Sequence, residues 1–369
     1  MSRRILFALR GKLGDTLACF ASVQAWRDAH PEDRLTLLTR RDYANLLRGE
    51  PGVEVVGFNS RLGMILRLLG WRLLRPPFAA LAVLWGFGKP IRWIGKLARA
   101  PRKAYLDGRF APLFDAWPPA ATFDDFTSRA EPAWRVARCL DAELPLPDQI
   151  ALPHLAARRP ASLPADAPLA LVPLADERRR CLDATDVARL ADWLTRSQPG
   201  RPLWLLANPR DEGAAALLAA PPAGIIARPF HSLEQLLAIY AELAGWYGTD
   251  TGLYHLAAAM GVPATVIFGP SEPAKVLLPG QPRVAGLRLA ALGPLRHCDA
   301  TRCQQPRCLQ LAVALATNEQ ANLQAVLPPL LDLAPTPADC PLRALPAAAL
   351  TAPDALLTYI PRSAPHSAP

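Results

Sequence analysis

The sequence lacks any apolar run long enough to cross a bilayer, although 51% of its 369 residues are hydrophobic. A membrane-spanning helix needs roughly 18 consecutive apolar residues, and charged residues, polar residues and prolines interrupt every stretch before that length. The apolar stretch Ile5–Leu9 near the N-terminus is also too short for a signal peptide. We therefore expect a cytoplasmic chain whose apolar residues are buried in sizeable cores.

The sequence also lacks the cysteine pattern of a disulfide scaffold. Its seven cysteines are odd in number and scattered, which is typical of a protein in a reducing cytoplasm. His297, Cys298, Cys303 and Cys308 invite a zinc hypothesis, but their spacing matches the paired cysteines and four ligands of usual zinc sites poorly. We predict that no metal is bound.

Acidic residues are absent from Val55 to Leu106, a segment that holds ten basic residues. The formal net charge of the whole chain is +9, so the remainder is close to neutral. The positive charge is therefore local, and it indicates a local anionic partner rather than nucleic acid. The basic residues are Arg61, Arg67, Arg72, Arg75, Lys89, Arg92, Lys96, Arg99, Arg102 and Lys103.

This basic tract, residues 61–103, has two interpretations. Met64–Arg75 has helical periodicity, and its arginines together with Arg61 occupy less than half of the helix circumference. A second basic helix is predicted over Ile91–Ala100, with Trp93 on it. Cationic helices that carry tryptophan suit an anionic membrane surface or lipid headgroup, whereas a solvated basic face over an ordinary core helix looks much the same.

Two motifs of phosphate-binding enzymes are also missing. No D-x-D occurs, so a phosphate-bound divalent metal is not expected, and no G-x-G-x-x-G marks a dinucleotide site. What the chain does contain is a repeated alternation of strands and helices, which predicts an α/β fold with parallel sheets and right-handed crossovers. The first domain is expected over residues 1–156 and the second over 169–332. Residues 157–168 have the composition of a linker, and residues 333–369 that of a disordered tail with one short helix near 350–357.

The most organised stretch runs from Trp246 to Pro270. A strand is predicted to end at Gly248, a polar turn to follow at Thr249–Gly252, and a helix to run to Met260, where Gly261 ends it with a left-handed cap. A polar turn that opens a helix exposes unpaired backbone N–H groups at the positive end of the helix dipole. The turn therefore favours an anion site, although Thr249 or Asp250 could simply cap an ordinary helix.

This stretch resembles a signature of the heptosyltransferase family of glycosyltransferases. Gly248–Pro263, followed by Phe268–Pro273, is similar to the family pattern G-N-D-T-G-x-x-H-L-A-A-A-x-G-x-P…F-G-x-[TS]-[DN]-P. Thr249 stands where the family usually has asparagine. The resemblance implies a GT-B fold, in which two Rossmann-like parallel-sheet domains face each other across a cleft.

A second family hallmark, R-x-x-x-L/M-G-D after the first strand, is present as Arg10–Asp15. The resemblance implies that Asp15 is the general base, with Lys12 and Gly14 beside the substrate. The alternative from local structure makes Asp15 the N-cap of the helix that follows.

The resemblance also implies a donor site in the second domain. Asp250, Thr251 and Gly252 would meet the donor diphosphate, and His255 could touch the phosphates or pack within its helix. Arg180 takes the place of a family lysine that holds the diphosphate, and this segment departs from the family pattern at Leu182 and Asp183. Glu212, at the predicted start of a helix, is a candidate ribose contact.

These implications make the chain a metal-independent, inverting glycosyltransferase that needs no cofactor. The expected donor is ADP-heptose and the expected acceptor a lipid-linked saccharide such as the lipopolysaccharide core. We expect the protein to be peripheral on the inner face of the cytoplasmic membrane. The alternative is an inactive or divergent relative that binds nucleotide or membrane, which the departures at Thr249 and at Arg180–Leu182 favour.

Overall fold

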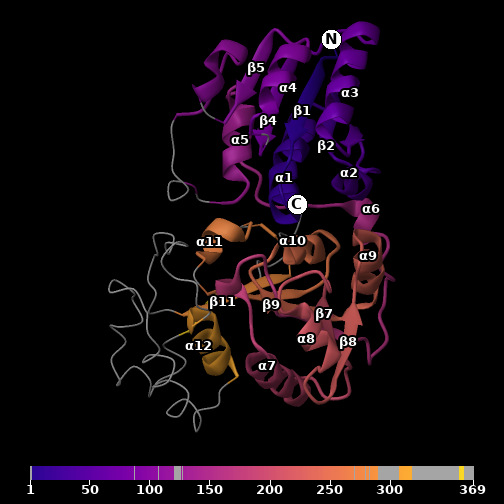
Figure 1. Ribbon diagram of the computed structural model, residues 1–369, viewed down its shortest axis with the longest axis vertical. Coiled ribbons are helices and arrows are strands. Elements are labelled where there is room, and N and C mark those ends of the chain that lie inside the picture. The colour runs from indigo at the N-terminus through magenta and orange to yellow at the C-terminus, as the bar shows by residue number, and fades with distance from the viewer. Residues whose placement is uncertain are drawn as a thin grey trace, which may run out of the picture. The chain divides into compact units, whose positions relative to one another are not determined.

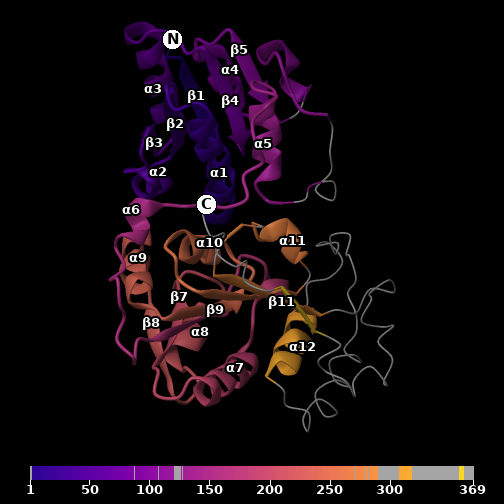
Figure 2. The same ribbon diagram turned by 180° about the vertical axis from the view of Figure 1, so that it is seen from behind.

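The computed structural model describes residues 2–86, 88–106, 108–119, 126, 128–269, 271–278, 280–281, 283–289, 307–317 and 357–360. The chain divides into two compact units. Unit 1 comprises Met1–His154 with Leu278–Gly280, and unit 2 comprises Leu155–Leu277 with Gln281–Pro369. Figures 1 and 2 label the elements of each unit, and α6 (Pro153–Ala156) lies where the chain passes from one unit to the other.

Unit 1 is built on a parallel sheet of five strands in the order β3-β2-β1-β4-β5. Its strands are short apolar runs that are mostly buried on both faces, as expected for a parallel sheet covered by helices on each side. The strands are β1 (Arg4–Leu9), β2 (Arg34–Arg40), β3 (Val53–Phe58), β4 (Ala80–Trp85) and β5 (Arg102–Tyr105).

Alternation along β1 shows which helix covers which face. Leu6 and Ala8 share a buried cluster with Met64 and Leu68 of α3, whereas Phe7 meets the Trp26 ring of α1 edge-on at 5.6 Å between centroids. Helices α3 and α4 therefore pack on the face opposite α1 (Figure 1). The helices are α1 (Leu13–Ala29), α2 (Arg41–Leu47), α3 (Arg61–Leu74), α4 (Ile91–Leu97), η1 (Gly108–Leu113) and α5 (Glu131–Arg138).

Unit 2 contains a seven-stranded sheet in the order β12-β11-β10-β9-β6-β7-β8, parallel except for the pairing of β12 with β11. Its strands are β6 (Leu169–Val172), β7 (Leu203–Ala207), β8 (Ile225–Pro229), β9 (Gly245–Thr249), β10 (Ala264–Ile267), β11 (Val284–Leu289) and β12 (Leu357–Ile360). Its helices are η3 (Arg178–Arg180), α7 (Ala184–Ser197), α8 (Ala214–Ala219), α9 (Leu233–Glu242), α10 (Gly252–Ala259), α11 (Pro273–Val276) and α12 (Arg307–Ala316).

The predicted α/β class with two parallel sheets is confirmed, and the left-handed cap at Gly261 is confirmed in detail. Gly261 has φ 74°, its N–H donates to the Ala258 carbonyl, and the N–H of Val262 donates to the Ala257 carbonyl. This pair of bonds is the Schellman motif, which satisfies the last carbonyls of α10.

Several predicted boundaries need correction. The helix α1 begins at Leu13 with Lys12 as its N-cap, so Asp15 lies within the first turn and is not the capping residue. Helix α8 begins at Ala214, and Glu212 therefore precedes it. Among the described residues of 118–150, one helix, α5, is present where two were predicted.

The C-terminal segment also differs where it is described. Leu357–Ile360 forms β12 and pairs antiparallel with β11, in a region predicted to be disordered. The short helix predicted near 350–357 falls mostly on residues outside the described part of the chain. No helix in the described ranges is both long and apolar enough to cross a membrane.

Each sheet has one point where the strand order reverses. In unit 1 the chain proceeds from β1 outward to β3 and then returns to β4 on the other side of β1. In unit 2 it proceeds from β6 outward to β8 and then returns to β9. Ligands of open α/β sheets bind at the carboxyl ends of the strands that flank such a switch point, here β1 with β4 and β6 with β9.

Candidate functional site

The switch point of unit 1 is held together by a close backbone contact. The Arg10 N–H, just after β1, donates to the Trp85 carbonyl at the end of β4, at 3.1 Å. Gly86 follows with φ 76°, and a Cβ there would collide with the Arg10 carbonyl oxygen. Only glycine tolerates both conditions, so the loops after β1 and β4 stay in register at the strand ends.

Asp15 lies at this switch point, in the first turn of α1, and an arginine holds it. Arg129 Nε and Nη2 donate to Asp15 Oδ1 at 2.9 and 2.5 Å. The Asp15 side chain is 14% exposed and that of Arg129 is 33% exposed. Because both bonds end on Oδ1, the carboxylate has a fixed orientation while Oδ2 remains available to accept a proton.

Lys12 and Gly14 flank Asp15 as predicted. Lys12 is the exposed N-cap of α1, and Gly14 is buried in its first turn. The first N–H groups of a helix have no intrahelical acceptors, and an acid in this turn is stabilised by the helix dipole. The structure thus brings these three residues together at the start of α1.

The switch point of unit 2 also contains a close approach between two strand backbones. The backbone of Gly248 in β9 passes so close to β6 that a Cβ would collide with the Val172 carbonyl oxygen. The chain after Gly248 continues through Thr249, which is fully buried, and Asp250 before α10 begins at Gly252. The predicted polar turn is therefore shorter than expected, because β9 extends through Thr249.

Arg180 and Asp250 meet at this point, although 70 positions separate them. Arg180 Nη1 donates to the Asp250 main-chain oxygen at 2.9 Å and to its Oδ2 at 3.1 Å, while Nη2 reaches Glu177 Oε1 at 3.3 Å. Ser271 Oγ also donates to Asp250 Oδ2, at 2.5 Å. Arg180 Nε is buried without a hydrogen-bond partner among the described residues, so one donor of this guanidinium is unused.

The positive charges of Arg180 and its neighbour Arg179 are balanced by nearby carboxylates. Arg179 is 4% exposed and donates through Nε to Glu177 Oε2 at 2.8 Å. Burial alone would raise the pKa of Glu177, but the hydrogen bond from Arg179 and the charges of Arg180 and Arg179 lower it overall. The cluster therefore pairs two guanidiniums with two carboxylates, while Arg178 on the same short helix is exposed.

Thr251 and Gly252 form the beginning of α10. Thr251 is the N-cap in an extended conformation, with φ −136° and ψ 156°, and its side chain makes no capping hydrogen bond. The N–H groups of this helix start next to the Asp250 main chain, which Arg180 contacts. The arrangement gives one location a helix dipole and a guanidinium, both suited to an anion.

His255 lies one turn into α10 and is buried, at 5% exposure. Its ring packs against the Tyr254 ring with centroids 4.0 Å apart, and Tyr254 Oη donates to the Val276 carbonyl at 2.6 Å. This packing fits the alternative in which His255 supports its own helix.

Glu212 is exposed in the loop after β7 and makes no hydrogen bond or ion pair within the described residues. Its charge nevertheless acts on Cys181, next to Arg180, and contributes with burial to a raised thiol pKa. Glu212 is therefore near the Arg180 loop but is not tied into the cluster.

Three residues of these sites carried no predicted role. Arg129 and Glu177 belong to no motif, and their partners are visible only in three dimensions. Ser271 was present in the quoted F-G-x-[TS] pattern, so its hydroxyl position was a usable signal.

The predicted absence of a metal is not decided by the structure. His297, Cys298 and Cys303 lie outside the described residues, and Cys308 is a buried free cysteine on α12. Metal independence stays a prediction.

The central region of the chain is similar to a known protein family. Residues 140–303 match the family model of glycosyltransferase family 9 (heptosyltransferase). The matched region contains Arg180, Glu212 and the whole turn at Asp250–Gly252. The resemblance to the heptosyltransferase family is therefore confirmed over this region. No curated protein sequence matches the chain.

Solved structures share the fold. A glycosyl transferase family 9 protein from Veillonella parvula aligns with TM-score 0.63 and 16% identity, over 77% of this chain and 85% of that one. Escherichia coli ADP-heptose lps heptosyltransferase II aligns with TM-score 0.62 and 18% identity, over 86% and 99%. E. coli heptosyltransferase WaaC with ADP aligns with TM-score 0.59 and 20% identity, over 75% and 90%. These matches confirm the GT-B fold class.

Proposed function

We propose, from the glycosyltransferase family 9 region at residues 140–303, that this protein transfers a sugar from a nucleotide diphosphate to an acceptor hydroxyl. The observation that carries the proposal is the meeting of Arg180 with Asp250 at the first residues of α10. This meeting lies at the switch point of a parallel sheet, inside the matched region.

Unit 2 supplies the donor site in this proposal. The diphosphate lies at the N–H groups that begin at Thr251 and Gly252, and Arg180 faces it with its remaining donors. As the bond from the anomeric carbon to the diphosphate oxygen breaks, negative charge builds on the leaving group. Arg180 and the dipole of α10 stabilise that charge. Arg180 therefore stabilises the transition state more than it stabilises the bound substrates.

Unit 1 supplies the base. Asp15 accepts the proton of the acceptor hydroxyl through Oδ2, while Arg129 holds Oδ1. The hydroxyl oxygen forms the new bond to the anomeric carbon as the diphosphate departs from the opposite side, which inverts the configuration. Lys12 lies one turn earlier and is positioned for acceptor binding.

The finer identity of the substrates rests on relatives. E. coli heptosyltransferase WaaC was solved with ADP, which supports ADP-heptose as the donor here. We propose a lipid-linked saccharide such as the lipopolysaccharide core as acceptor, and a location on the inner face of the cytoplasmic membrane. We propose that transfer is metal-independent, with Arg180 and the dipole of α10 as the groups that face the diphosphate.

A second candidate is a divergent relative that binds nucleotide without transfer. The observation that favours it is the segment after η3, where the chain departs from the family pattern at Leu182, which is buried at 3% exposure. Glu177 and Asp250 also neutralise the two arginines of the cluster, so a diphosphate must compete with them for Arg180.

Purified protein incubated with ADP-heptose and a lipid-linked core saccharide tests the proposal. We expect ADP release that depends on the acceptor, together with a product heavier by one heptose in the mass spectrum. Addition of a chelator should leave the rate unchanged. ADP binding without any acceptor-dependent release would favour the second candidate.

A further inference from the structure

Helix α3 has two apolar faces, and only one of them is buried. Met64, Leu68 and Trp71 pack into the core under the sheet of unit 1. An amphipathic surface helix normally carries polar residues on its other side. Here the other side carries leucines.

These leucines form a continuous row, which we call the leucine stripe and which consists of Leu62, Leu66, Leu69 and Leu73. At 100° per residue the four side chains lie within about 60° of one another on the helix. They are 64%, 59%, 36% and 79% exposed, and Leu74 at the end of the helix is 85% exposed. Contiguous exposed apolar rows of this kind mark contact surfaces rather than ordinary surface composition.

Positive charge borders the stripe on both sides. On the helical wheel Arg67 lies on one flank, and Arg61 and Arg72 lie on the other. The acid nearest in sequence, Glu54, is held by Arg75 at 3.0 Å, and no acid occurs between Val55 and Leu106. The stripe therefore has a cationic border and no anionic one in this segment.

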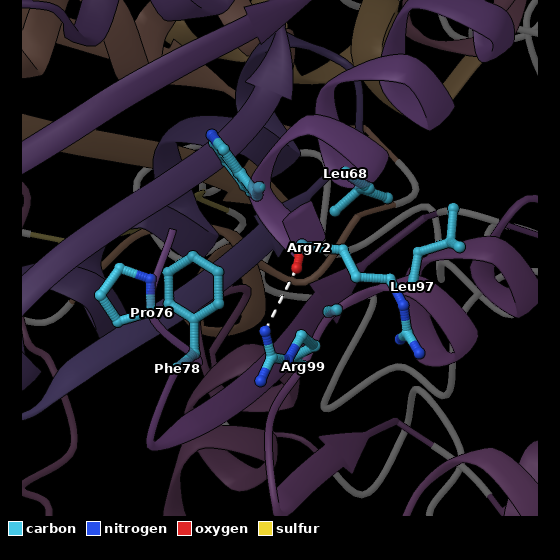
Figure 3. A pocket seen from close by; sticks show the side chains of 8 residues that line it. Leu68, Arg72, Pro76, Phe78, Leu97 and Arg99 are labelled. Carbon is cyan, nitrogen blue, oxygen red and sulfur yellow. Dashed lines mark hydrogen bonds between the residues drawn. The ribbon is translucent and has the colours of Figure 1, made fainter. Parts of the chain in front are cut away.

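A shallow hollow lies between the ends of α3 and α4 (Figure 3), on the side of α3 that carries Leu68, Trp71 and Arg72. Arg99 donates to the Arg72 carbonyl at 3.2 Å, and Arg72 donates to the Lys96 carbonyl at 3.3 Å. Each guanidinium thus caps the end of a helix with one of its N–H donors and retains others for an anionic oxygen. The hollow is lined by Leu68, Trp71, Arg72, Pro76, Phe78, Leu97, Ala98 and Arg99.

We propose that α3 lies in the interface of an anionic bilayer, with the leucine stripe among the acyl chains and the flanking arginines at the phosphate level. The apolar row matches the acyl-chain region of such a bilayer, and the cationic borders match its anionic headgroups. A second copy of the chain is less suited as the occupant, because packing stripe on stripe would bring cationic borders together. The inference concerns α3 of unit 1 and does not rest on the transfer reaction.

Insertion of the leucine stripe predicts a salt dependence of membrane binding that differs from binding by basic charge alone. If arginines alone held the protein at a membrane, binding would vanish at high salt, since surface charges are screened. If leucines insert, part of the binding survives salt because burial of apolar area is not screened.

The test uses the full chain with vesicles of phosphatidylcholine alone and of phosphatidylcholine mixed with phosphatidylglycerol. We expect binding to the mixed vesicles that falls with salt but stays above zero. The double variant Leu66→Gln, Leu73→Gln should bind at least about 100-fold more weakly, which is the scale of removing two buried leucines from an apolar phase. The matched control is the double variant Leu146→Gln, Ile226→Gln, whose side chains are 41% and 51% exposed elsewhere and which should bind like the parent.

The melting temperature and the mass in solution are measured for the parent and for each variant. Equal binding by the stripe variant and the parent would overturn the proposal and leave adsorption by arginines alone. A parent that is dimeric, fails to bind vesicles and becomes monomeric in the stripe variant would also overturn it, in favour of self-association. Because no sugar substrate is used, either result leaves the proposed transfer activity to its own test.

Discussion

The two switch points have opposite arrangements of charge. In unit 1 an aspartate, Asp15, is held by an arginine from a distant loop, and in unit 2 an arginine, Arg180, is held by an aspartate. Asp15 accepts both bonds on one oxygen, whereas Arg180 distributes its donors over Asp250 and Glu177. The first arrangement preserves a proton acceptor, and the second preserves a cation that can exchange a carboxylate for a phosphate. In the proposed reaction, unit 1 removes the proton and unit 2 stabilises the anion.

The largest effect among the binding residues is expected at Arg180. Arg180→Ala should lower turnover by about 100-fold, the scale of removing one donor that stabilises developing charge. The matched control is Arg178→Ala, two positions earlier on η3 and exposed, which should lower turnover only slightly. Steady-state transfer rates measure both. Equal losses in the two variants would mean that general positive charge, not the Arg180 position, matters.

Loss of a single backbone donor should have a smaller effect. Thr251 has φ −136°, which proline cannot adopt, but Gly252 is the first residue of α10, where proline is tolerated and only the N–H is lost. Gly252→Pro should weaken ADP binding about tenfold, as expected for one hydrogen bond to a charged group. Gly252→Ala keeps the N–H and is the control. Calorimetric titration measures the ADP affinity of each variant. An unchanged ADP affinity in the proline variant would contradict the placement of the diphosphate at the start of this helix.

Arg129 should matter less than the groups that touch substrate. Arg129→Gln leaves Asp15 without its ionic partner, and we expect kcat to fall about fivefold to tenfold while KM for the donor stays the same. Arg135, which pairs with Glu131 on α5, offers a matched control in Arg135→Gln. A fall in donor affinity instead of kcat would contradict a role in positioning Asp15.

A buried acid in unit 2, Asp186, makes the stability of the protein depend on pH. Asp186 on α7 is 2% exposed, and burial with the charge of Asp183 raises its pKa to about 7. Because this folded value lies above the unfolded value of 3.8, the folded state binds the extra proton between the two, and stability falls as pH rises from 3.8 to about 7. Asp186→Asn should therefore stabilise the protein by up to about 4 kcal/mol above pH 7, because one pKa unit corresponds to about 1.36 kcal/mol, and by little near pH 4. Thermal melts across this range check it, and equal gains at both pH values would contradict the assignment.

Local sequence patterns predicted the framework well. Short apolar runs bounded by polar turns gave strands such as β6, and Gly261 followed by Val262–Pro263 gave the end of α10. These features depend on residues close together in the chain, where periodicity and backbone preferences decide.

Long-range contacts were not predictable in this way. The Arg129–Asp15 pair spans 114 positions, and nothing in the sequence around Arg129 distinguishes it from other arginines. The start of α1 was placed too late because Lys12 is a weak capping residue, and β12 was missed because its pairing with β11 is long-range. The alanine- and proline-rich tail gave no strand signal of its own.

The division of roles between the two units can be tested at Asp15 in one measurement. Donor binding and single-turnover transfer are measured on the same preparation of Asp15→Asn, beside its melting temperature. We predict parental folding and parental ADP-heptose affinity, with transfer slower by about 100-fold or more, because asparagine cannot accept the proton. An Asp15→Asn protein that folds, binds donor and transfers sugar at the parental rate would contradict it.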